Sequence, residues 1–110
     1  MALRIKNLTP HDVVIITDRL WLTFEPEGIV PRVAIEADNM PMLGDVFPIR
    51  REHYGQVMDL PDEEDGTILI VSRMVADACH DRHDLVFPTD LVRDEEGKII
   101  GCRSFGFVAN

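Results

Sequence analysis

The residues best suited to chemistry stand together in one run, Cys-His-Asp-Arg-His-Asp, at positions 79–84. The run holds two imidazoles, two carboxylates, a guanidinium and a thiol. His80 and His83, together with the carboxylates, are groups that bind zinc, iron or manganese. A zinc site usually draws its ligands from separated parts of a chain, so other ligands would have to converge here. The competing interpretation is a solvated helix end, where imidazoles lie near the negative end of the helix dipole.

Nucleophilic catalysis is a second kind of chemistry that these residues suggest, because a thiol or hydroxyl needs only an adjacent base. Cys79, however, falls on the apolar face of a predicted helix, and Ser72 is needed to cap the start of that helix. Neither a P-loop nor a dinucleotide-binding motif occurs in the chain. We therefore name no catalytic residue, expect no cofactor, and favour a protein that is not an enzyme.

The elements around the run predict a single domain over residues 1–110. Residues 67–71 form an apolar run typical of a buried strand, and Ser72 precedes a helix predicted near residues 72–80. The first half shows short β-branched and aromatic runs between turn residues, with a loop over residues 38–45 and Trp21 as the largest buried side chain. This pattern predicts an α+β fold, with a mainly antiparallel β-sheet or small curved barrel and one short helix.

The charge balance is acidic, since 20 Asp and Glu oppose 11 Lys and Arg and give a net charge of -9. Direct binding to nucleic acid is therefore disfavoured, because the negatively charged phosphates bind to basic protein surfaces. Two cysteines are too few for a disulfide framework, and neither a secretion signal nor an apolar stretch of membrane-spanning length is evident. We expect a cytoplasmic location and no membrane partner.

One acidic segment is the strongest candidate for electrostatic recognition of a protein. Five carboxylates follow one another without a Lys or Arg between them, at Asp59, Asp62, Glu63, Glu64 and Asp65. A cationic protein partner is compatible with this segment, and so is a simple solvated loop.

A set of short motifs extends over nearly the whole chain and resembles a family of small bacteriophage and prophage proteins. The motifs are Asn7-Leu8-Thr9-Pro10-His11, Tyr54-Gly55-x-Val57, Leu60-Pro61, Ile70-Val71-Ser72, Arg82-x-Asp84-x-Val86-x-Pro88 and Gly97-x-x-x-Gly101-Cys102. The resemblance implies a phage or prophage setting and the cytoplasm of a bacterium or infected host cell. It transfers no activity and no catalytic residue, and it implies the Arg-x-Asp pair without the His pair.

Three functions remain open at this point. The preferred one is a non-catalytic phage or prophage accessory protein that binds a host or phage protein, for example to inhibit a host defence system. The second is a module for a small ligand or nucleotide, whose pocket residues would be Asn7, Thr9, His11, Arg82 and Asp84. The third is a small metal-dependent enzyme that uses His80 and His83. Arg82 and Asp84 also fit a structural clamp between helix and strand, and a homo-oligomer is compatible with all three functions.

Overall fold

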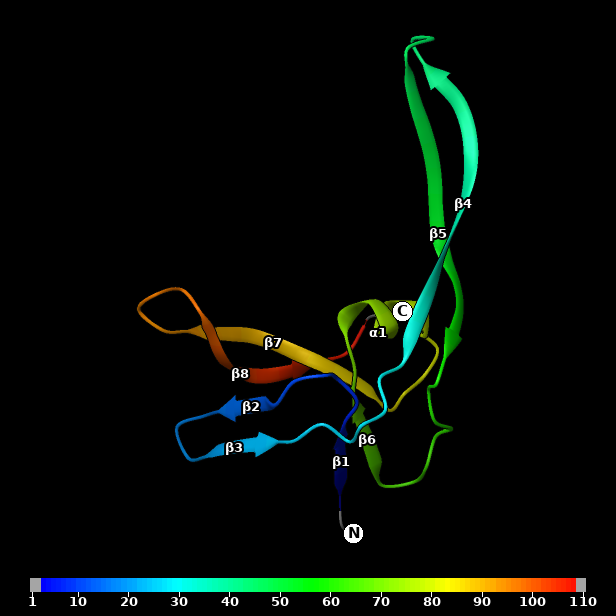
Figure 1. Ribbon diagram of the computed structural model, residues 1–110. Coiled ribbons are helices and arrows are strands. Elements are labelled where there is room, and N and C mark those ends of the chain that lie inside the picture. Colours follow the sequence, from blue (N-terminus) through cyan, green and yellow to red (C-terminus); the bar gives the residue numbers. More distant parts are fainter. Residues whose placement is uncertain (1–2, 109–110) are drawn as a thin grey trace.

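The computed structural model describes residues 3–108 of the chain, in eight strands and one helix. In chain order these are β1 (Arg4–Asn7), β2 (Val13–Ile16), β3 (Trp21–Phe24), β4 (Arg32–Leu43), β5 (Phe47–Met58), β6 (Thr67–Ile70), α1 (Arg73–Ala78), β7 (Leu85–Arg93) and β8 (Ile99–Gly106) (Figure 1). The mainly β composition with one short helix confirms the predicted α+β class.

Six of the strands form the body of the molecule, in one sheet with the order β1-β6-β7-β8-β2-β3. The hairpins β2–β3 and β7–β8 are antiparallel, whereas β1–β6, β6–β7 and β2–β8 are parallel, so the body sheet is mixed. The alternative prediction of a barrel is wrong. The outer strands β1 and β3 share no ladder, and a single bridge between Asn7 and Pro26 is the described pairing that brings the two edges together.

The core lies on both faces of β6, the strand with the most apolar sequence. Leu69 and Val71 face one cluster, which α1 covers with Val75 and Ala76. Ile70 alternates to the other face and packs there in a second cluster, whose other buried members are Val13, Val86 and Cys102. Such alternation follows from the two-residue period of a strand. As predicted, Ser72 caps α1, and its Oγ accepts a hydrogen bond from the Val75 amide at 3.2 Å.

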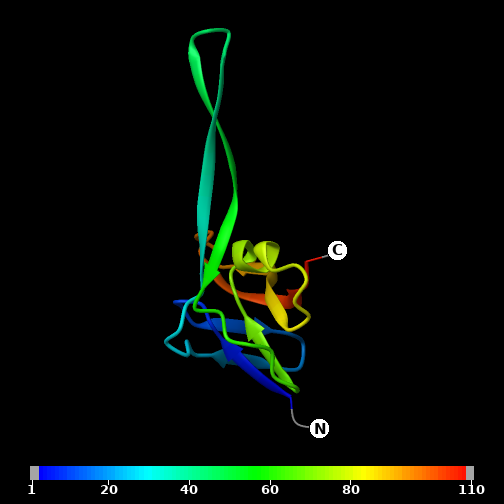
Figure 2. The ribbon, with the colours of Figure 1, turned by 90° about the vertical axis from the view of Figure 1, so that its right-hand side faces the viewer.

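The remaining two strands, β4 and β5, pair only with each other and leave the body as a long hairpin, which we call the arm (Figure 1). In the view turned by 90° the arm again stands clear of the body, and its strands wind around each other (Figure 2). The arm makes the molecule elongated. Its radius of gyration is 17.4 Å, whereas a compact domain of this length has about 13 Å.

Two predictions for the first half of the chain are wrong. The predicted loop over residues 38–45 belongs mostly to β4, because pairing with β5, with a register shift between Met40 and Leu43, extends that strand to Leu43. Trp21, predicted to be buried, is 67% exposed, because β3 is the outermost strand of the sheet and no element within residues 3–108 covers this side chain.

Candidate functional site

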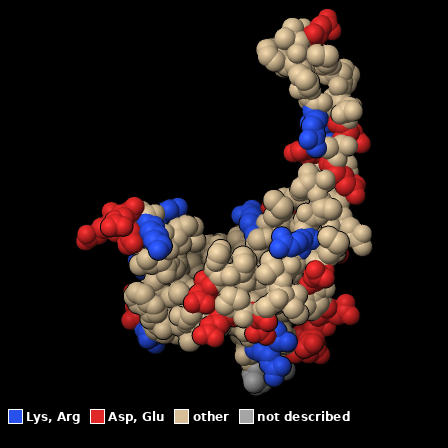
Figure 3. Space-filling view, in the orientation of Figure 1, with Lys and Arg blue, Asp and Glu red and all other residues tan. Residues whose placement is uncertain are grey.

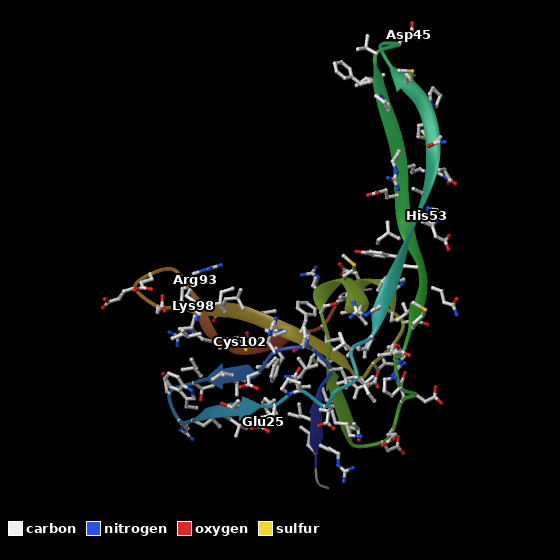
Figure 4. The ribbon with its side chains drawn as sticks, viewed as in Figure 1. Glu25, Asp45, His53, Arg93, Lys98 and Cys102 are labelled. Atoms are coloured by element: carbon white, nitrogen blue, oxygen red, sulfur yellow. The ribbon has the colours of Figure 1, made fainter. Side chains whose placement is uncertain are left out.

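The end of the arm carries a group of exposed apolar side chains. Six large apolar side chains gather around its turn and are each between 36% and 64% exposed. We call them the apolar tip: Met40, Met42, Leu43, Val46, Phe47 and Ile49. Figure 3 shows the end of the arm almost without charge, with one acidic group at its extremity, and Figure 4 identifies that group as Asp45. Exposed apolar surface that no residue of the described range covers is typical of a protein-binding site.

A two-residue turn holds the tip in a defined shape. Gly44 and Asp45 have φ angles of 61° and 58°, and the Val46 amide donates to the Leu43 carbonyl at 3.2 Å. Positive φ at both central residues defines a type I′ turn, whose twist matches that of the strands it joins. Glycine adopts this conformation without strain, and aspartate tolerates it better than most residues. The turn therefore presents the apolar side chains at the end of a hairpin whose register shifts between Met40 and Leu43.

The middle of the arm, which we call the shaft, is polar, and polar side chains contact one another across its two strands. Arg51 lies 3.6 Å from Asp38 across the two strands, and His53 lies 3.2 Å from Glu36 in the same way. Opposite charges on directly paired residues stabilise a two-stranded ribbon. The polar side chains of the shaft therefore contact one another, and the exposed apolar side chains of the outer arm lie at the tip.

Apolar side chains return at the base of the arm, where it meets the body. Ile35 and Tyr54 are register partners on the two strands, and with Met74 of α1 they line an open hollow of about 520 Å³. The polar lining comes from Glu52 and His53. Contacts between α1 and both strands fix the direction in which the arm leaves the body.

Of the predicted ligand-binding residues, Asn7, Thr9 and His11 form a closed structural clasp. The Asn7 side chain is 1% exposed, and its amide nitrogen donates to the carbonyls of His11 and Phe24, both at 2.8 Å. Its oxygen accepts from the Thr9 amide at 2.9 Å and from the Thr9 hydroxyl at 2.7 Å. This network ties the end of β1 to the start of β2 and the end of β3.

The other two predicted ligand-binding residues, Arg82 and Asp84, form the clamp that the sequence suggested. The guanidinium donates two hydrogen bonds to the Asp84 carboxylate, at 2.9 and 2.8 Å, and a third to the Pro61 carbonyl at 2.8 Å. The carboxylate of Glu63 lies 3.3 Å from Nε. The hydrogen bonds to Asp84 raise the pKa of Arg82 above its ordinary value. The clamp joins the segment before β7 to the acidic segment before β6.

The structure does not join these two groups into one pocket. Among residues 3–108, no hydrogen bond or ion pair connects the clasp with the clamp, and every buried side-chain nitrogen or oxygen has a partner. Neither the hollow at the base of the arm nor a smaller one on the body sheet is lined by these residues. The side-chain polar atoms of Asn7, Thr9, Arg82 and Asp84 bond within the fold, whereas the His11 side chain is exposed.

The candidate metal ligands are spread along a helix end. His80 is exposed, and its Nδ1 lies 3.3 Å from the Asp77 carbonyl, while His83 is exposed in the following turn. Within the described range, no three His, Cys, Asp or Glu side chains are grouped as a metal ion requires. Burial raises the pKa of the half-buried Cys79 thiol, which disfavours its nucleophilic thiolate form.

The predicted protein-binding carboxylates lie on the surface, and one of them has a structural contact. Asp59, Asp62, Glu64 and Asp65 are exposed, as is Glu63 beside Arg82. A second acidic group, at residues 94–96, occupies the β7–β8 turn, and Figure 3 shows such acidic groups on the body, away from the tip.

The arm is the functional element that sequence reasoning missed. Its signal was present in the apolar residues on both sides of Gly44-Asp45, in the stretch from Met40 to Ile49. Pro41 and Pro48 interrupt that stretch and favour a loop assignment, because proline is rare inside sheets. An isolated two-stranded ribbon has edges on both sides, so both prolines are accommodated here.

Comparison of the chain with protein-family models, curated proteins and solved structures finds no match. Among residues 3–108, no helix combines the length and the apolar character needed to cross a membrane.

Proposed function

We propose that this chain is a non-catalytic binding protein that docks onto another protein through the apolar tip of its arm. One observation carries the proposal: six large apolar side chains are exposed together at the end of a hairpin that projects from the body. Apolar surface held in water is unfavourable by about 25 cal/mol per Å² relative to burial, so a partner that covers it gains stability.

The architecture supports a docking role for the arm. A two-stranded ribbon is marginally stable alone, yet this one continues beyond its contacts with α1, with cross-strand polar contacts along the shaft and a turn at its end. Of the arm's residues, only Val33 and Val57, both near its base, pack as partly buried members against the core clusters. The outer arm therefore contributes no buried side chain to folding, and partner contact accounts for its length and its apolar end.

The acidic segment at residues 59–65 has a separate part in the proposal. Its carboxylates lie on the body, and we assign to them the steering of a basic protein surface toward the molecule. Charges at the rim of an interface raise the association rate more than the affinity. With the resemblance to phage and prophage proteins, these features support an accessory protein that binds a phage or host protein, of which inhibition of a host defence system is one form.

Affinity capture with a matched pair of variants tests the proposal. The tip variant carries serine in place of Met42, Leu43 and Phe47. The control carries serine in place of Leu20, Trp21 and Phe107, which are similarly exposed on the body and near the C-terminal end of the described chain. Both are used as bait in lysate of the cells that naturally express the protein, after circular dichroism has shown that both fold.

The wild type and the control are expected to retain the same bound protein, and the tip variant is expected to lose it. Equal retention by the tip variant would refute docking through the arm. Loss in the control alone would assign the binding surface to the edge of the body sheet instead.

A further inference from the structure

We propose that the partner of the apolar tip is a second copy of this chain, which receives the tip in a hollow on its body sheet. This inference rests on the proposed function, because it names the partner of the same tip. It starts from the second apolar depression of the molecule, which the proposed function leaves unused.

The hollow lies where β2, β7 and β8 meet, and it has a volume of about 130 Å³. Its apolar lining includes Val13, Val14, Leu91, Ile99 and Ile100. Leu91, Ile99 and Ile100 are 37% to 48% exposed, so they form an open apolar rim. A cavity of about 150 Å³ is known to accommodate a benzene molecule. The hollow therefore has the size of one aromatic ring.

The tip offers one such ring. Phe47 is 62% exposed beside the turn of the arm. It does not enter the hollow of its own chain, because the arm points away from the strands that line the hollow, and the two lie at distant parts of the molecule (Figures 1 and 4). An intermolecular contact, with the ring of one copy in the hollow of the next, buries both exposed apolar surfaces at once.

The area of this contact reaches the need of a stable interface when two copies exchange arms. Burial of one large apolar side chain corresponds to roughly 60–120 Å² at about 25 cal/mol per Å², so the exposed fractions of the six tip residues correspond to roughly 300 Å². A similar area on the receiving copy brings one contact to about 600 Å², which is half of the roughly 1,200 Å² that specific protein interfaces need. A reciprocal exchange of arms between two copies doubles this area and reaches that bound.

The charges around the two surfaces are compatible with the contact. Asp45 is the single charged residue of the tip. Arg93 and Lys98 lie at the end of β7 and just before β8, next to the rim residue Ile99 (Figure 4). They offer cationic partners to Asp45, while the carboxylates of residues 94–96 lie in the turn beyond them and Asp12 lies at the other side of the hollow.

Tip and hollow are different surfaces, so the contact is head to tail. Such contacts close into a dimer or ring when the rotation between copies allows it, and otherwise extend as a filament. The same feature makes the inference testable by complementation. A copy with a damaged tip keeps its hollow, and a copy with a damaged hollow keeps its tip.

The experiment measures mass in solution for the wild type, Phe47→Ser, Leu91→Arg and an equimolar mixture of the two variants. Size-exclusion chromatography with light scattering gives the masses, and circular dichroism with thermal melting shows that each variant folds. We expect the wild type to have at least twice the mass of one chain and each variant alone to have the mass of one chain. The mixture is expected to form a species with one copy of each variant, which native mass spectrometry identifies by its mass.

Three outcomes would overturn the inference: a monomeric wild type, an oligomer that survives Phe47→Ser or Leu91→Arg, or a mixture of folded variants that stays monomeric. An oligomer that survives Leu91→Arg but is lost in Phe47→Ser would mean that arms associate with arms. If the wild type is monomeric while affinity capture still depends on the tip, the second copy is excluded and the proposed function stands. If capture is insensitive to the tip, the proposed function itself fails.

Discussion

Asn7 shows how a residue with a suggestive side chain can belong wholly to the fold. All four of its side-chain hydrogen bonds go to groups within the chain, and two of them end on backbone carbonyls from separate segments. An amide in this position acts as a connector between strands, because it offers donors on one side and an acceptor on the other.

Replacing Asn7 with alanine is expected to lower the free energy of unfolding by about 3 kcal/mol, because buried groups lose their partners. Urea denaturation measures the change. His11→Ala is the control, since only the backbone carbonyl of His11 joins the network and its side chain is exposed. We expect the control to change stability by less than about 0.5 kcal/mol. Equal effects of the two substitutions would contradict the structural role of Asn7.

Arg82 and Asp84 form the strongest ion pair of the described chain by geometry. The side chains are 19% and 8% exposed, and the contact has two parallel hydrogen bonds. Asp84→Asn is expected to cost about 2 kcal/mol, because it removes the carboxylate that accepts two hydrogen bonds from the partly buried guanidinium and leaves the more exposed Glu63 as its counter-charge.

The matched control for this pair is Asp77→Asn. Asp77 pairs with Arg73 at 3.1 Å on the exposed side of α1, and such pairs contribute at most about 0.5 kcal/mol. Thermal melting of the two variants is expected to separate them clearly. If the melting temperature of the Asp84→Asn variant equals that of the Asp77→Asn variant, the clamp is not structural.

At the scale of elements, the helix and the strands beside it were predictable, whereas the arm was not. The apolar run at residues 67–71 and the cap Ser72 are local signals, and local signals determine these elements. The extent of β4 and β5 depends on cross-strand pairing between residues far apart in sequence, such as Arg32 and Met58. The exposure of Trp21 depends on its strand having no outer neighbour, which no local pattern encodes.

We expect the body of the molecule to fold without the outer part of the arm. Residues 39–50 can be replaced by an Asn-Gly turn, because Asp38 and Arg51 face each other across the ribbon and Asn-Gly suits a two-residue hairpin. No residue in the removed segment belongs to either core cluster. We therefore expect a melting temperature within about 4 °C of the wild type. A loss of cooperative melting would show that the outer arm supports the body.

At the scale of the whole molecule, the charge of -9 opposes association of identical copies. Salt screens this repulsion, because the Debye length falls from about 30 Å at 0.01 M to about 10 Å at 0.1 M ionic strength. Burial of the apolar tip is not weakened in this way.

Sedimentation of the purified protein over this range of salt is therefore expected to show tighter self-association as the salt concentration rises. Binding of a basic partner to the acidic segment would show the opposite dependence. Self-association that weakens with salt would contradict an apolar contact between copies and indicate an ionic one.

The most direct test of the central claim, that the arm tip docks onto a protein, is photo-cross-linking from position 47 in living cells. Benzoylphenylalanine in place of Phe47 places the reactive group at the tip, and the same residue in place of the exposed Glu25 places it on the body (Figure 4). The account predicts a discrete protein adduct from position 47 that is absent from position 25. Equal yields from the two positions, or no adduct from position 47, would contradict it.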